Sequence, residues 1–85
     1  MEAQLSEEAK KVLRAVADRA MDGYTLMRMT GLEQAQAEAA LGTLLDNGLV
    51  RVEGALHGDE FGKAYLWVPP SVQGKVDYVL GKFAL

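Results

Sequence analysis

Apolar residues near the start of the chain recur at spacings of three and four, which is the period of one face of a helix. Ser6 precedes Glu7 and Glu8, and a hydroxyl cap followed by carboxylates in the first turn is typical of a helix start. The sequence therefore predicts a first helix from about Glu7 to Met21. Its apolar stripe consists of Ala9, Val12, Leu13, Val16, Ala17 and Ala20.

Two more helices follow after a turn with the sequence DGY. Thr25 can cap a short second helix over about 26–30, and Gly31 suits the left-handed residue that ends many helices. Leu32 restarts the helical pattern, and Gly48 in "DNGLV" ends it in the same way. The apolar positions of this third helix are Ala37, Ala40, Leu41, Leu44 and Leu45.

The second half of the chain changes to the period of two that strands show. Valines alternate with charged residues over 50–53, Gly54 to Lys63 has the glycines of a long hairpin tip, and Ala64 to Val68 predicts the returning strand. Two prolines end that strand, and Ser71 can cap a last helix over about 71–85. The apolar stripe of that helix consists of Val72, Val76, Val79 and Phe83.

Length and composition predict one folded domain that spans 1–85, with 49% hydrophobic and 25% charged residues. The absence of cysteine excludes disulfides and thiolate metal sites, and it fits a reducing cytoplasm. The charged N-terminal segment lacks the apolar stretch of a signal peptide, and no uncharged run approaches the ~18 residues of a membrane helix. We therefore expect a cytoplasmic protein with no membrane partner.

The net charge of -3 is concentrated in one segment. Between Thr30 and Val50 there are three acids, Glu33, Glu38 and Asp46, and no base, whereas the rest of the chain has nine of each sign. Proteins that bind duplex DNA usually show the opposite bias, because lysine and arginine neutralise the phosphates. The location of the charge is evidence against strong DNA binding by the third helix.

The sequence contains no pattern typical of catalysis or of cofactor binding. It has no thiol, a single histidine, and two serines that both fall at predicted caps, so no pair of nucleophile and base is indicated. His57 lies near Asp59 and Glu60, but a glycine-rich tip rarely holds metal ligands in place. We therefore expect no enzyme activity, no cofactor and no metal.

The order of helix, short helix, turn, helix and hairpin resembles the winged helix-turn-helix family, most closely regulators of the MarR, ArsR and PadR types. The resemblance covers about 6–68, and it implies an α+β fold with a three-helix core and a two-stranded β-hairpin wing, to which the C-terminal helix is added. It rests on the "GL" that opens the third helix and the "LLDNGLV" that closes it. The matching positions are Gly31, Leu32, Leu41, Leu44, Gly48, Leu49 and Val50.

In this family the third helix enters the major groove of double-stranded DNA, and the wing touches a neighbouring backbone or minor groove. The resemblance implies that Gln34 and Gln36 read adenine edges, that Ala39 touches a thymine methyl group, and that Thr43 also faces the DNA. Contacts to phosphates would come from Thr25, Arg28, Arg51 and Lys63. The sequence departs from the family pattern at Glu33 and Glu38 on the reading face, and at Asp59 and Glu60 on the wing tip.

Two functions remain open on the sequence alone. The first is a DNA-binding transcription regulator, which the analogy of fold places narrowly ahead. Such a protein would dimerise through Val72, Val76, Val79 and Phe83, since a poorly basic reading helix gains most from doubled contacts. The second is a protein-protein interaction module, in which the acidic face of the third helix binds a basic or polar partner. The two glutamines are also explained by a simple solvated helix face.

Overall fold

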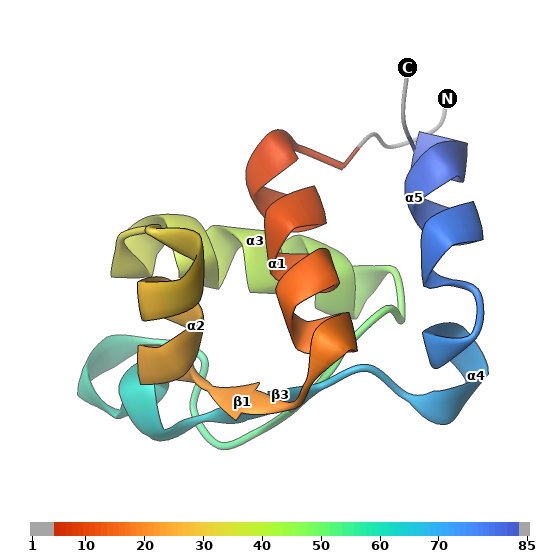
Figure 1. Ribbon diagram of the computed structural model, residues 1–85. Coiled ribbons are helices and arrows are strands. Elements are labelled where there is room, and N and C mark those ends of the chain that lie inside the picture. The colour runs from red at the N-terminus through yellow and green to blue at the C-terminus, as the bar shows by residue number, and fades with distance from the viewer. Residues whose placement is uncertain (1–4, 84–85) are drawn as a thin grey trace.

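The computed structural model describes residues 5–83 and shows an α+β fold in which helices pack on a three-stranded antiparallel sheet (Figure 1). The elements in chain order are α1 (Glu7–Asp18), β1 (Met21–Asp22), α2 (Gly23–Thr30), α3 (Gln34–Asp46), β2 (Arg51–Glu53), the 3-10 helix η1 (Gly58–Lys63), β3 (Tyr65–Trp67), α4 (Pro70–Gln73) and α5 (Val76–Phe83). No helix among residues 5–83 has the length and apolar character needed to cross a membrane.

The predicted helix ends are confirmed at Ser6, Gly31 and Gly48. The predicted caps Thr25 and Ser71 are wrong, because α2 begins at Gly23 with Asp22 as its cap and α4 begins at Pro70 with Pro69 before it. The hydroxyl of Ser6 accepts a hydrogen bond from the amide of Ala9 at 3.1 Å. Gly31 and Gly48 have φ values of 73° and 70°, the left-handed backbone that glycine adopts without strain. The first helix ends at Asp18 and not at Met21, because Met21 belongs to strand β1.

The sheet has one more strand than the sequence predicted, and its order is β1-β3-β2. Leu66 in the central strand β3 pairs with Met21 on one side and Val52 on the other, so these three side chains share the face toward the core. Tyr65 and Trp67 point to the opposite face, where their ring centroids are 6.0 Å apart. The prediction of a two-stranded wing was incomplete because it missed β1. This strand has only two residues and overlaps the turn signal "DGY".

The core lies between α1, α3 and the inner face of the sheet, and α2 closes one end. Leu13, Leu26, Leu41 and Leu44 are fully buried, which confirms the helical stripes derived from the sequence. Leu32, which restarts the apolar pattern before the third helix, and Val52, which belongs to the alternating strand pattern, are expected in the core but are only half-buried. The other large side chains that are fully buried are Val12, Val16, Val50, Phe61 and Leu66.

The segment predicted as an open hairpin tip is folded back onto the domain. Its residues form η1, which packs against α2 and buries the side chain of Phe61 completely. The close approach depends on two glycines: a Cβ on Gly23 would overlap the carbonyl group of Phe61, and a Cβ on Gly62 would overlap the ring of Tyr24. A buried phenylalanine contributes several kcal/mol of stability, roughly 3–5 by the effect of its removal.

The C-terminal segment, predicted as one helix over 71–85, forms two helices separated by a turn at Gly74. Helix α5 lies beside α1 (Figure 1), and Leu80 is buried there. The residues predicted for a dimer interface pack in part on the core of their own domain, namely Val72, Val76 and Val79. The side chain of Phe83 lies outside the described part. The C-terminal helix does not cover the face of the sheet that carries Tyr65 and Trp67, because α5 packs on α1 and Tyr65 is 48% exposed.

Asp22 caps helix α2, and this cap predicts a pH-dependent stability. Its Oδ1 accepts a hydrogen bond from the amide of Thr25 at 2.8 Å, and that bond lowers the pKa of Asp22 below the ordinary 3.8. A lowered pKa in the folded state stabilises the protein above the ordinary value, and the contribution is lost as the pH falls below it. We expect Asp22→Ala to lower the free energy of unfolding by about 1 kcal/mol near neutral pH.

The expected loss in Asp22→Ala should shrink when urea unfolding is repeated at about pH 2.5, because this pH lies below the ordinary pKa of Asp22, where the unfolded chain binds the proton and the contribution of the ionised cap declines. Asp18→Ala, which removes an exposed carboxylate at the end of α1, is the matched control and should change the free energy by less than about 0.5 kcal/mol. An Asp22→Ala loss of equal size at both pH values would contradict a charge-dependent cap.

Candidate interaction face around α3

Helix α3 turns its apolar side to the core and leaves alanines and polar residues exposed on the other side. Leu41 and Leu44 point inward and are fully buried. On the other side, Ala35, Gln36 and Ala39 are exposed. The outward surface is therefore accessible to a partner, and its properties depend on the polar and charged groups at its two edges.

Gln34, the first predicted base reader, is bound within the molecule. Its side-chain nitrogen donates to Glu38 Oε2 at 2.6 Å and to the carbonyl oxygen of Gly58 at 2.8 Å. Because a side-chain amide has two N–H groups, both donors are in use. Gln34 therefore fastens the folded tip to α3, and its donors are not available for an adenine unless the tip moves.

Glu38 receives a second contact from the tip. Nδ1 of His57 lies 2.9 Å from Glu38 Oε1, and the histidine side chain is 80% exposed while that of Glu38 is 19% exposed. The hydrogen bond from Gln34, and after it the bond to His57, lowers the pKa of Glu38 below its ordinary value. Glu38 therefore carries a negative charge at neutral pH, on the face where a DNA-binding helix would meet phosphates.

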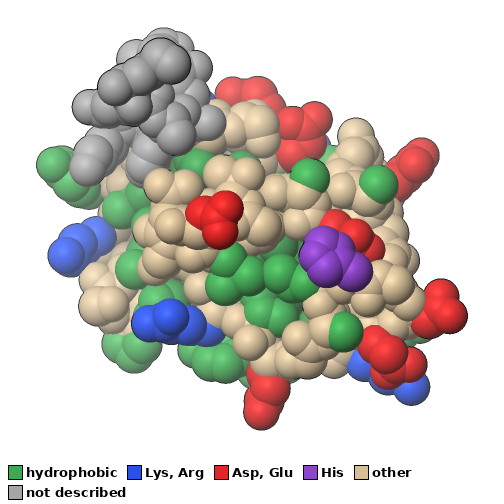
Figure 2. Space-filling model, turned by 180° about the vertical axis from the view of Figure 1, so that it is seen from behind, with side chains coloured by type: hydrophobic (Ala, Val, Ile, Leu, Met, Phe, Trp, Pro, Cys, Tyr) green, Lys and Arg blue, Asp and Glu red, His purple; other side chains and the backbone are tan. Residues whose placement is uncertain are grey.

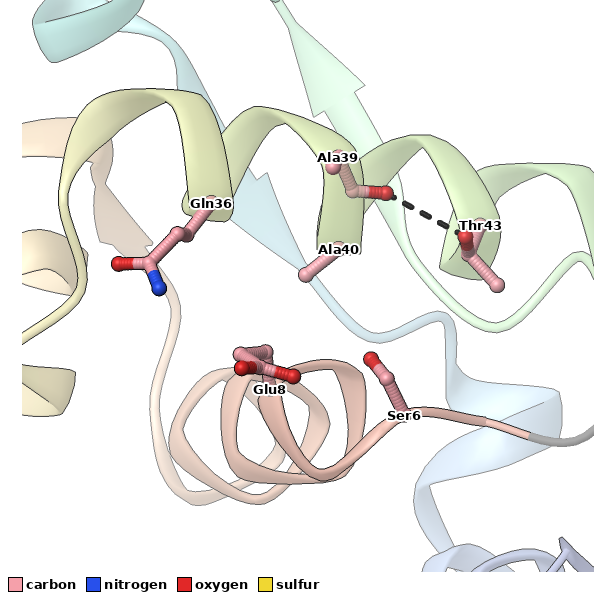
Figure 3. Close-up of a pocket in the computed structure, with 6 residues that line it drawn as sticks. All are labelled: Ser6, Glu8, Gln36, Ala39, Ala40 and Thr43. Carbon is pink, nitrogen blue, oxygen red and sulfur yellow. Dashed lines mark hydrogen bonds between the residues drawn. The ribbon is translucent and has the colours of Figure 1, made fainter.

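Gln36, the second predicted reader, helps to cap its own helix. Its Oε1 accepts a hydrogen bond from the backbone amide of Glu33 at 3.0 Å, at the start of α3. The carboxamide nitrogen of Gln36 has no partner among the described residues and remains a free donor. The side chain faces a pocket between α3 and the beginning of α1 (Figure 3).

This pocket, which we call the α1–α3 pocket, has a volume of about 220 Å³. Figure 3 shows the side chains of Gln36 and Ala40 directed from α3 toward α1, with Glu8 and Ser6 on the opposite wall. The Thr43 hydroxyl donates to the carbonyl oxygen of Ala39 at 3.3 Å. The lining residues are Ser6, Glu8, Gln36, Ala39, Ala40 and Thr43, and they include a carboxylate but no cation.

The predicted DNA contacts are therefore brought together only in part. Gln36, Ala39 and Thr43 lie together along the α1–α3 pocket. The cations come from elsewhere: Arg28 is in α2, Lys63 ends η1, and Arg51 is opposite Trp67 on the outer face of the sheet. Thr25 is half-buried in the first turn of α2. Arg28, Arg51 and Lys63 are all exposed.

The face that holds α3 and the tip combines apolar surface with carboxylates. Figure 2, which views the molecule from behind, shows hydrophobic side chains gathered beside the single histidine, with acidic side chains around them and basic side chains at the left and lower right of the view. The half-buried hydrophobic residues of α3, β2 and the following loop are Leu45, Val52 and Leu56. The exposed or partly exposed acids of α3 are Glu38 and Asp46, whereas Glu53 of β2 pairs with Tyr65 and lies with Arg51 on the outer face of the sheet.

No protein-family model, curated protein or solved structure matches the chain. The site is therefore interpreted from its own residues. Two of them, Glu8 and His57, are not indicated as members of this site by the sequence. Glu8 lies 28 residues before Gln36 in the chain, and no local pattern indicates that α1 and α3 place them across one pocket. The pairing of His57 with Glu38 likewise requires the folded tip.

Proposed function

We propose that this chain is a winged-helix domain that binds a basic protein segment on the face around α3. The order α1-β1-α2-α3-β2-β3 and the antiparallel sheet support the winged-helix resemblance. The observation that carries the functional proposal is the combination of half-buried Leu45, Val52 and Leu56 with the carboxylates of α3, Glu38 and Asp46. Apolar surface surrounded by charge is typical of protein interfaces.

Binding to DNA is the second candidate. Three exposed cations favour it, Arg28, Arg51 and Lys63, which are the phosphate contacts that the family resemblance implies. It ranks below protein binding because α3 carries no cation and because both N–H donors of the Gln34 side chain are already hydrogen-bonded within the domain. A homodimer through the C-terminal helix and a cytoplasmic location stay predictions within either proposal.

Reversing the charge on the exposed side of α3 distinguishes protein binding from DNA binding. The variant Ala35→Lys/Asp46→Lys places two cations on the exposed side of α3, and Asp18→Lys/Ala20→Lys makes the same chemical changes at exposed positions outside it. The probes are a helical peptide with leucines on one side and arginines on the other, and a random DNA duplex, each followed by fluorescence anisotropy over a salt series. We expect the parent protein to bind the peptide and to show no duplex binding at low salt.

The α3 variant should bind the peptide about tenfold more weakly, because attraction becomes repulsion, and it should gain duplex binding that falls with salt. The control variant should change peptide affinity by less than about twofold. The proposal is wrong if the parent protein binds the duplex with a falling log K against log salt while the peptide does not bind. Equal effects of the two variants would show that net charge alone, and not the α3 face, is recognised.

A further inference from the structure

We propose that the α1–α3 pocket is a binding site for an arginine side chain of the protein partner. This inference rests on the proposed function and specifies one contact of it. The pocket is lined by the Glu8 carboxylate, by the carboxamide of Gln36 and by small or short side chains of α3. No lysine or arginine is part of the lining, so no cation of the pocket itself pairs with the Glu8 carboxylate.

Glu8 is the residue that defines the charge of the ligand. Its side chain is half-buried and faces α3 across the pocket (Figure 3). Within the part of the chain that the structure describes, Glu8 makes no ion pair, whereas neighbouring Glu7 is bridged to Lys10 at 3.4 Å. The start of α1 contributes roughly half a positive charge. One full carboxylate at Glu8 exceeds that, so the pocket favours a cation.

The shape of the pocket favours a long side chain with a cationic end. Ala39 and Ala40 offer a small apolar surface, and an aliphatic stem lies well on such a surface while its charged group reaches a polar one. A guanidinium group can give a carboxylate two parallel hydrogen bonds, which a lysine ammonium cannot do in the same plane. The Thr43 hydroxyl, which donates to Ala39, keeps lone pairs for a further donor.

The test uses blocked arginine (N-acetylarginine methylamide) as the probe and blocked citrulline as its neutral equivalent. A contact of one side chain gives millimolar affinity at best, so the titration extends to about 100 mM at constant ionic strength. Backbone amide shifts of the full chain report where the probe binds. We expect saturable shifts at Gln36, Ala39, Ala40 and Thr43 with arginine, and no saturable shifts with citrulline.

Two substitutions provide the matched comparison. Glu8→Gln and Glu7→Gln remove the same charge from the same helix turn, but only Glu8 lines the pocket. We expect Glu8→Gln to weaken arginine binding about fivefold or more and Glu7→Gln to change it by less than about twofold. Ala39→Leu, which fills the pocket and keeps the charge, should also abolish the saturable shifts. Amide spectra of the unliganded variants verify that each is folded.

The inference fails if citrulline produces the same saturable shifts, if Glu7→Gln weakens binding as much as Glu8→Gln does, or if arginine produces no saturable shift in the pocket. Such a failure is distinguishable from failure of the proposed function. The arginine-rich peptide can still bind the α3 face and respond to Ala35→Lys/Asp46→Lys while the blocked arginine does not enter the pocket. In that case the interface is correct and the arginine site is not.

Discussion

Replacing Phe61 with alanine should lower the free energy of unfolding by about 3–5 kcal/mol, the largest loss expected from any single change in the tip. The side chain is fully buried although it belongs to a short 3-10 helix between two strands. Its removal takes away a large apolar contact and leaves a cavity, since η1 packs against α2 and the residue after it, Ala64, accepts a hydrogen bond from the amide of Gly23. Urea unfolding followed by circular dichroism measures the loss.

Tyr78→Ala is the control for Phe61→Ala, because it also removes an aromatic ring but from a side chain that is 73% exposed. It should change the free energy of unfolding by less than about 0.5 kcal/mol. Phe61→Ala should in addition release the tip from α3, so the amide of Gly58 should exchange faster with solvent than in the parent protein. A loss of less than about 1 kcal/mol would mean that the tip is not part of the core.

The sequence predicted those parts of the fold that have a local chemical signal. Ser6 caps α1, Gly31 and Gly48 end α2 and α3, and the buried leucines fall on the helical stripes. It did not predict the fold of the tip. Three glycines in "GALHGDEFGK" indicate an open loop, and the single phenylalanine is the one signal for a buried turn. The apolar residues of this segment, Ala55, Leu56 and Phe61, follow neither the helical nor the strand period, so pattern analysis gives Phe61 no weight.

The candidate site was predicted with less success because its contacts join distant parts of the chain. The pair Gln34 and Glu38 is four residues apart, a spacing that places two side chains together on a helix. The partners that give the pair its role, His57 and the carbonyl of Gly58, lie 19 and 24 residues away along the chain. The sequence identified which polar side chains α3 carries. It did not show that two of them are already bound within the domain.

The packing of the tip against α2 predicts that substitution by alanine lowers the free energy of unfolding at Gly23 and raises it at Gly42. Gly23 begins α2, and a Cβ there would lie 3.0 Å from the carbonyl carbon of Phe61 and closer still to its oxygen. Backbone atoms cannot rotate away as a side chain does, so η1 would have to shift. Gly42 lies in the middle of α3, and a Cβ there would have no neighbour outside the helix within 4 Å.

We expect Gly23→Ala to lower the free energy of unfolding by about 1–3 kcal/mol, the usual effect of overpacking a tight contact. Gly42→Ala should raise it by about 0.5–1 kcal/mol, because alanine loses less backbone freedom in a helix and adds no clash. Urea unfolding of both variants and of the parent protein measures whether the free energy of unfolding falls or rises in each case. If Gly23→Ala were as stable as the parent, η1 would not be held against α2. The contacts of Gln34 and His57 that close the tip over α3 would then have to form without that support.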